Sequence, residues 1–142
     1  MTGKLWLLSA LALALTACAE RTEEEVVSNW TTDGTPKEVR VELGEGRGVE
    51  VQQFHENGRI QTRGTLLNGV RQGVWNTYRE DGLPWSRVTY KAGIKEGLFR
   101  TWHVDGKPHI EGQHTGGAPS GKWRFYSTEG DLVETQDFGA PK

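Results

Sequence analysis

Aromatic and glycine positions recur along the chain with a period of 24 residues. In each period an aromatic residue is followed four positions later by a glycine, and an Asp, Asn or Glu stands directly before that glycine. Asn-Gly and Asp-Gly favour a two-residue type I′ turn, in which both central residues have positive φ. The sequence therefore predicts that the chain turns back at the glycines of this column: Gly34, Gly58, Gly82, Gly106 and Gly130.

The stretches between these turns are typical of β-strands. Residues 73–78 (GVWNTY) and 85–90 (WSRVTY) are short and rich in aromatic and β-branched residues, and no window has a helical period of useful length. Two strands of about six residues and two connections fill one period. Each period is therefore predicted to be a β-hairpin, joined to the next by a looser loop that contains Gly69, Gly93 or Gly117.

Stacked hairpins predict one all-β domain over residues 30–142, a single-layer antiparallel sheet built from about five hairpins. Equivalent residues then lie on every second strand, about 10 Å apart. Two columns are expected to interleave into an apolar ladder: Trp75, Phe99 and Trp123 with Leu66, Tyr90, His114 and Phe138. Trp75 and Tyr78 are three residues apart. Either a bulge brings them to one face, or both faces of the sheet carry aromatic residues.

The pattern G-x-W-x-x-Y-x-x-(N/D)-G, present at residues 73–82, resembles the bacterial variant of the MORN (membrane occupation and recognition nexus) repeat. It recurs at residues 97–106 and 121–130, and the resemblance covers roughly residues 30–138. The first unit departs from it, with Val51 in place of the Trp. The resemblance implies an open sheet of hairpins with an interaction or scaffolding role and no chemistry of its own. Many bacterial proteins of this kind are named antitoxins.

The N-terminus has the order of a secretory signal peptide. Lys4 precedes an apolar run from Leu5 to Ala17, which is too short to span a bilayer as a helix, and Cys18 follows. The ending Leu-Thr-Ala-Cys resembles the lipobox of bacterial lipoproteins. That resemblance implies cleavage after residue 17, lipidation of Cys18 and, because Ala19 and not Asp follows, anchoring in the outer membrane facing the periplasm. Residues 18–29 are expected to form an acidic tether.

Composition and charge exclude several classes of function. The chain has 17 Lys and Arg against 19 Asp and Glu, which gives no electrostatic footprint for nucleic acid. Cys18 is the only cysteine, so no intramolecular disulfide and no cysteine-based metal site can form. Residues 116–122 match a phosphate-binding P-loop, but Trp123 occupies the position of the required Ser or Thr. We therefore expect no nucleotide.

The titratable residues are better explained by turns and packing than by chemistry. His55 and His103 share a column with Arg79 and Ser127, which indicates a solvated edge. His114 stands where the ladder has apolar residues, so packing is its expected role. The acids that precede the column glycines are accounted for by turn formation. We expect no catalytic residue, no metal and no cofactor, and hence no enzymatic activity.

The aromatic residues remain as candidates for binding, because exposed aromatic patches mark interaction sites. The sequence predicts a cell-envelope lipoprotein that is attached to the membrane through Cys18 and presents its sheet to a protein partner. Two alternatives stay open: a peptidoglycan-binding or glycan-binding lipoprotein that uses the tryptophan ladder, and an antitoxin-like protein that neutralises a toxin. The candidate binding face consists of Trp75, Tyr78, Phe99, Trp102, Trp123 and Tyr126.

Overall fold

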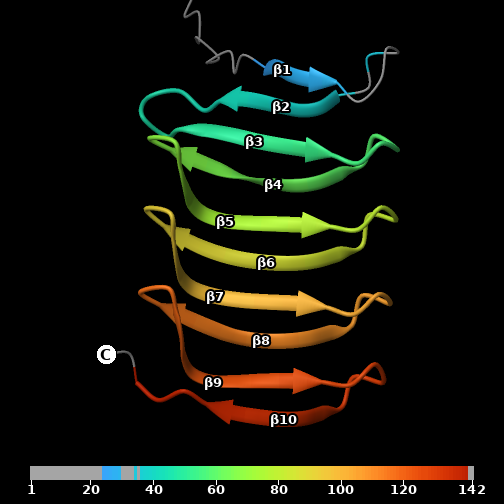
Figure 1. Ribbon diagram of the computed structural model, residues 1–142, viewed down its shortest axis with the longest axis vertical. Coiled ribbons are helices and arrows are strands. Elements are labelled where there is room, and N and C mark those ends of the chain that lie inside the picture. Colours follow the sequence, from blue (N-terminus) through green and yellow to red (C-terminus); the bar gives the residue numbers. More distant parts are fainter. Residues whose placement is uncertain (1–23, 30–33, 35, 141–142) are drawn as a thin grey trace, which may run out of the picture.

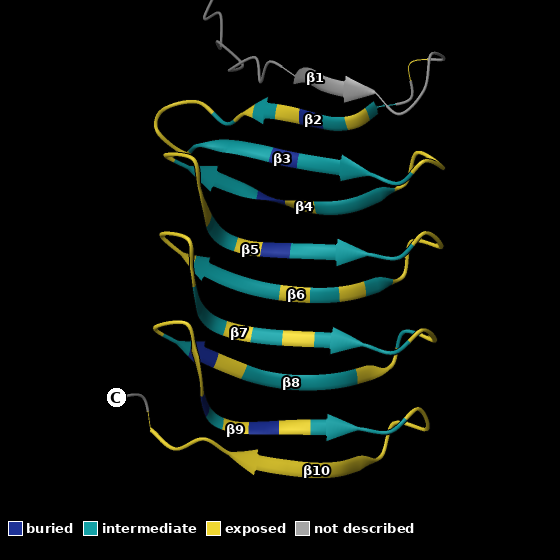
Figure 2. Ribbon diagram, viewed as in Figure 1, coloured by how far each residue is buried: buried dark blue, intermediate teal, exposed yellow. Residues whose placement is uncertain are grey.

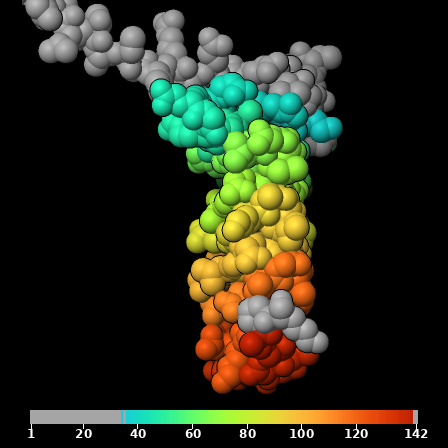
Figure 3. Space-filling model, turned by 90° about the vertical axis from the view of Figure 1, so that its left-hand side faces the viewer, coloured from blue at the N-terminus to red at the C-terminus, as the bar shows by residue number. Residues whose placement is uncertain are grey.

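The computed structural model describes residues 24–29, 34 and 36–140, and that part of the chain contains ten β-strands and no helix. The strands form one antiparallel sheet in which every strand pairs with its neighbours in the sequence (Figure 1). They are β1 (Glu24–Asn29), β2 (Pro36–Glu42), β3 (Val49–Phe54), β4 (Ile60–Leu67), β5 (Val70–Tyr78), β6 (Pro84–Lys91), β7 (Ile94–Trp102), β8 (Pro108–Thr115), β9 (Ala118–Tyr126) and β10 (Leu132–Asp137). Seen from the side, the sheet is a narrow, elongated body (Figure 3).

This architecture confirms the expected all-β class and the single open antiparallel sheet. The sheet begins earlier than the predicted residue 30. Strand β1 lies in the segment 18–29, which was predicted to be a tether, and it pairs with β2. A strand at the edge of a sheet presents unpaired N–H and C=O groups, so the chain that precedes β2 gains hydrogen bonds by lying along it. The predicted signal peptide and Cys18 lie outside the described residues.

The turns at the column glycines are not the two-residue type I′ turns that the sequence predicted. The Gly58 N–H donates to the His55 carbonyl (2.9 Å), and the His55 N–H donates to the Arg59 carbonyl (2.8 Å). Gly58 has a φ of 78°, whereas Asn57 has no positive φ. This is a three-residue loop, a type I turn followed by a glycine bulge. The Asn57 side chain stabilises it by accepting the Arg59 N–H (3.0 Å).

The same pair of backbone hydrogen bonds recurs at the next three column glycines, Gly82, Gly106 and Gly130. The two-residue turns lie instead at the opposite ends of the strands, where looser loops were predicted. Asn68 and Gly69 have φ values of 52° and 78°, and Ala92 and Gly93 have values of 49° and 83°. Positive φ at both central residues defines a type I′ turn. Gly116 and Gly117, with φ values of 58° and 89°, form the third.

Further glycines lie at β-bulges that seat two tryptophans. The register of β4 with β5 shifts between Arg63 and Thr65, and the segment of β5 opposite this shift begins with Gly73, whose φ is 70°. The bulge interrupts the ladder of hydrogen bonds, and the Trp75 indole N–H donates to the Thr65 carbonyl (3.1 Å). In β9 the Trp123 indole N–H donates to the Gln113 carbonyl of β8 in the same way (3.2 Å). Each tryptophan therefore bonds to the strand before its own at the interrupted position.

The core is a strip of buried residues on β2 to β5, and buried residues recur on β8 and β9 (Figure 2). Trp75 and Trp123 are 7% and 8% exposed, although no second layer covers them within the described part of the chain. The two indoles lie against Gly64 and Gly112 of the preceding strands, where an added Cβ would overlap the ring. Glycine at these positions lets a large ring lie flat on the sheet, so one layer can bury it.

Aromatic contacts extend this strip toward the C-terminus. Phe99 stacks on Trp123, with ring centroids 5.1 Å apart, and the His114 ring meets both edge-on. Phe138 covers the other side of Trp123 at 5.8 Å. His114 is buried, which confirms the packing role expected from its column. Burial, and then the charge of Lys95, keep the pKa of His114 below its usual value, so the ring packs here as the neutral form.

Side chains at the C-terminal ends of β3, β5 and β7 tie each hairpin to the next. In each case the residue directly after the strand bonds through its side chain to the last backbone carbonyl of the second strand along the chain. These bonds join His55 to Tyr78 (3.0 Å), Arg79 to Trp102 (3.0 Å) and His103 to Tyr126 (2.9 Å). The prediction that this column forms a solvated edge is therefore wrong, because the side chains of His55, Arg79 and His103 are partly buried and bond to backbone carbonyls. The column is a row of stabilising contacts between hairpins.

Candidate functional site

The six aromatic residues predicted to form one binding face lie on two faces. Trp75, Asn76 and Thr77 pair with consecutive residues of β6, and the register shift before Tyr78 adds the extra residue, Trp85, to β6, so β5 itself is regular between Trp75 and Tyr78. Residues three apart on a regular strand point to opposite sides. Both faces therefore carry aromatic residues, and each takes three of the six. Trp75, Phe99 and Trp123 lie on one side, and Tyr78, Trp102 and Tyr126 lie on the other.

The first three belong to the core just described, and we call their side the aromatic face. Trp75 and Trp123 are buried, and Phe99 is partly covered by His114. The guanidinium of Arg71 lies over the Trp75 ring, 4.5 Å from its centroid. A ring that is covered in this way offers little surface to a partner. The aromatic face therefore stabilises the sheet, and the candidate site lies on the other side.

The other side carries a row of arginines that crosses the sheet, and we call it the arginine face. Arg63, Asn76, Arg87, Arg100, Glu111 and Arg124 occupy consecutive paired positions from β4 to β9. Paired residues of neighbouring strands share a face and lie about 5 Å apart. Four of the six positions in this row are arginine. Such a row is a continuous positive surface wherever acids do not neutralise it.

The acids on the arginine face neutralise only part of this charge. Arg63 forms an ion pair with Glu50 (2.9 Å), and Arg100 forms one with Glu111 (2.7 Å). Arg87 donates to the Asn76 amide oxygen (2.9 Å), which carries no charge. The Arg124 side chain makes no hydrogen bond or ion pair with any of the described residues. The guanidinium groups of Arg87 and Arg124 are thus available to an anionic ligand.

Glu111 is held from both sides. One carboxylate oxygen pairs with Arg100, and the other accepts the Tyr126 hydroxyl (3.1 Å). Partial burial and then this hydrogen bond raise the pKa of the Tyr126 phenol, so it stays a donor. A carboxylate with two such partners is fixed in place. Tyr126 and Glu111 therefore hold the Arg100 guanidinium in a defined position.

Apolar side chains accompany the arginines. Leu98 is 70% exposed and Val74 is 47% exposed, both on the arginine face. The Trp102 ring has the guanidinium of Arg87 at 5.9 Å and that of Arg100 at 6.0 Å from its centroid. Cation–π contacts of this kind hold arginines in defined orientations. The face thus combines oriented cations with exposed aliphatic groups.

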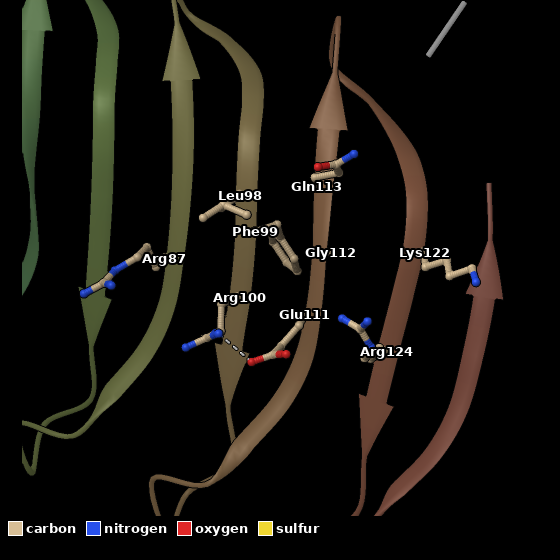
Figure 4. A pocket seen from close by; sticks show the side chains of 9 residues that line it. All are labelled: Arg87, Leu98, Phe99, Arg100, Glu111, Gly112, Gln113, Lys122 and Arg124. Carbon is tan, nitrogen blue, oxygen red and sulfur yellow. Dashed lines mark ion pairs between the residues drawn. The ribbon is translucent and has the colours of Figure 1, made fainter. Parts of the chain in front are cut away.

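The middle of this surface is hollowed. A shallow hollow of about 420 Å³ lies over β6 to β9 (Figure 4). Its charged lining residues are Arg87, Arg100, Lys122 and Arg124 with Glu111 as the one acid, and Leu98 lies at its side. Asp137 of β10 pairs with Lys122 in the register but does not line the hollow. The lining is strongly basic, although the whole chain has a formal net charge of −2.

Comparison with protein-family models, with curated proteins and with solved structures finds no match to this chain. Within the described residues, no group of three or more His, Cys, Asp or Glu could hold a metal ion. No helix in that part of the chain is long and apolar enough to cross a membrane.

Sequence reasoning placed Tyr78, Trp102 and Tyr126 correctly in a repeating column but missed the arginines beside them. The signal was present, because Arg63 and Arg87 are 24 residues apart and so are Arg100 and Arg124. This signal is weak because other members of the same columns include Val, Glu, Thr, Gln and Asn, and because a net charge near zero hides a local group of arginines. Residues of these two columns pair across neighbouring strands, as Arg87 and Arg100 do, and so the two columns together form one row.

Proposed function

We propose that this protein is a non-enzymatic, lipid-anchored component of the cell envelope whose MORN-type repeat sheet serves as a protein-binding or scaffolding surface. The arginine face is the binding surface. The observation that carries the proposal is the combination of exposed arginines and aliphatic side chains with half-buried aromatic rings over β5 to β9. Protein interfaces are enriched in these residue types, and their strongest contacts come from Trp, Tyr and Arg.

The rest of the fold supports a binding role by making this surface rigid. The side chains of Gln72 and Glu96 accept backbone N–H groups of the next connecting turn, from Ala92 at 2.8 Å and from Gly116 at 2.7 Å. At the other edge, the column that contains His55 and its equivalents ties successive hairpins together. A surface that is already ordered loses less entropy when it binds.

Membrane anchoring is supported by the Leu-Thr-Ala-Cys sequence that ends at Cys18. Acyl chains on this residue would contribute about 0.8 kcal/mol for each buried CH₂ group. The mature chain would carry a net charge of −3, since removal of residues 1–17 leaves 16 Lys and Arg against 19 Asp and Glu. Lipid chains rather than surface charge would therefore hold it at the membrane.

Two experiments in cells test the proposal. A photo-crosslinking amino acid at Leu98 is expected to give a specific protein adduct, whereas the same group at Val133, which is 64% exposed on β10, is not. Adducts from both positions, or from neither, would count against the arginine face. The Cys18→Ser variant is expected to remain unprocessed and to carry no lipid. A variant that stays in the membrane and is still processed would refute the lipid anchor.

A further inference from the structure

We propose that the hollow of the arginine face binds an extended acidic segment of a partner protein, with carboxylates against Arg87 and Arg124 and an apolar side chain against Leu98. This inference rests on the proposed function and names the chemistry of the partner. Its first support is charge complementarity, because four basic residues and one acid line the hollow. The single acid, Glu111, is already occupied by Arg100 and Tyr126.

The spacing of the two guanidinium groups that have no acidic partner sets the spacing of the carboxylates. Arg87 on β6 and Arg124 on β9 occupy one row and are separated by three steps between neighbouring strands. At about 4.8 Å for each step, the two positions lie about 14 Å apart. In an extended peptide, residues four positions apart are separated by a similar distance, about 13 Å, and point to the same side. An acidic segment that crosses the strands can therefore engage both arginines with residues i and i+4.

The exposed aliphatic groups favour a polypeptide over other anionic ligands. Leu98 is the most exposed of the large apolar side chains in the described residues, at 70%, and it borders the hollow. A protein segment can cover Leu98 with an apolar side chain between its two acids. A polyphosphate has no such group. A sugar ring would need a free aromatic face, but the Trp102 ring already has two guanidinium groups near it.

The test uses the full-length chain in a neutral detergent and a fluorescein-labelled peptide in which Glu-Ser-Leu-Ser is repeated three times. In an extended conformation this peptide places Glu and Leu alternately on one side, with Glu every four residues. We expect fluorescence anisotropy to show binding that weakens as salt rises, because exposed charge pairs are screened. The matched peptide with Gln in place of Glu is expected not to bind.

Variants locate the site. Combining Arg87→Gln with Arg124→Gln is expected to weaken peptide binding about tenfold, the loss expected for two solvent-accessible ion pairs. The control combines Arg40→Gln with Lys107→Gln, which removes the same charge from exposed side chains outside the hollow. It is expected to change the dissociation constant less than twofold. Circular dichroism and thermal melting of both variants verify that the sheet is intact.

Several outcomes would overturn the inference. Equal losses in both variants would show that general charge, not the hollow, attracts the peptide. Binding of phosphatidylglycerol vesicles or hyaluronate through Arg87 and Arg124, without peptide binding, would identify a lipid or glycan ligand instead. Self-association of the chain that Arg124→Gln abolishes, measured by light scattering without peptide, would show that a second copy occupies the face.

The outcomes separate this inference from the proposed function. A specific adduct from Leu98 in cells, without binding of the acidic peptide, refutes the acidic segment but retains a protein partner. Peptide binding in solution, without any adduct in cells, retains the chemistry of the hollow but refutes its use for a partner protein. When both succeed, mass spectrometry of the adduct is expected to place the crosslink in a partner segment with carboxylates four residues apart.

Discussion

Replacement of Gly112 by alanine tests the central feature of this one-layer core. Gly112 has no positive φ, so its backbone accepts alanine and only the contact with Trp123 changes. An added Cβ would lie 2.7 Å from Cγ of the indole and nearer still to other ring atoms. Carbon atoms in contact are about 3.5 Å or more apart. The indole must therefore move by about 1 Å or tilt away from the sheet.

The cost follows from what this movement disturbs. Overpacking costs about 1–3 kcal/mol, and loss of the hydrogen bond from Trp123 to the Gln113 carbonyl (3.2 Å) adds about 1 kcal/mol. Restriction of the unfolded chain by alanine returns about 0.4–1 kcal/mol. We expect a net loss of about 2 kcal/mol in the free energy of unfolding. With a urea m-value of about 2 kcal/mol/M, the unfolding midpoint falls by about 1 M.

Urea titration followed by circular dichroism measures this midpoint, and amide hydrogen exchange locates the effect. Hairpins in such an array contact only their neighbours, so exchange should rise in β8 to β10 far more than in β3 and β4. The matched background is Trp123→Leu, in which Gly112→Ala is expected to cost little because the ring is absent. A midpoint unchanged by Gly112→Ala in the native background would refute the seating of the indole on this glycine.

Two further predictions concern the turns and the buried histidine. Ala92→Gly is expected to stabilise the protein by about 1 kcal/mol, because Ala92 has a φ of 49° and a left-handed residue with a Cβ costs about 1–2 kcal/mol; a lower melting temperature in this variant would contradict the type I′ turn. Because the pKa of His114 is lowered in the folded protein, a proton binds this histidine more tightly in the unfolded chain. The contribution of the neutral His114 to stability is therefore fully present above the unfolded pKa of about 6.5 and declines as the pH falls below that value. His114→Tyr, which introduces the residue of the Tyr90 position, should reduce this decline between pH 7 and pH 5, and an unchanged pH profile would exclude His114 as its source.

The period of the sequence was sufficient to predict the architecture but not the local turn types. Glycine and aromatic columns correctly indicated a meander of hairpins in one sheet. Asp-Gly and Asn-Gly occur both in two-residue turns and in three-residue loops with a glycine bulge, and the dipeptide alone does not distinguish them. The distinction depends on the register, which the bulges beside Gly73 and its equivalents shift. A bulge leaves only a glycine in the sequence, so its position could not be assigned beforehand.

The arrangement of residues at the candidate site could not be predicted for a similar reason, because it too depends on the strand register. Residues that share a face are set by strand parity, and parity changes at every bulge. The columns of Trp75 and Tyr78 were therefore combined into one face, although they lie on opposite sides of β5. The arginine row was hidden for a related reason: neighbours across strands, such as Arg87 and Arg100, belong to different columns of the repeat. Only the observed strand register shows that they are neighbours in one row.

A single-layer sheet also explains why the two faces have different roles. Burial without a second layer requires large rings that lie flat on glycines, and the aromatic face meets this requirement with Trp75 and Trp123. Once that side provides the core of the C-terminal strands, the other side can keep exposed residues such as Arg87, Leu98 and Arg124. Exposed Leu98 and the unpaired cation of Arg124 contribute nothing evident to stability in this position. A surface that keeps such groups together, on a backbone held rigid from both edges, has the properties required for binding rather than folding.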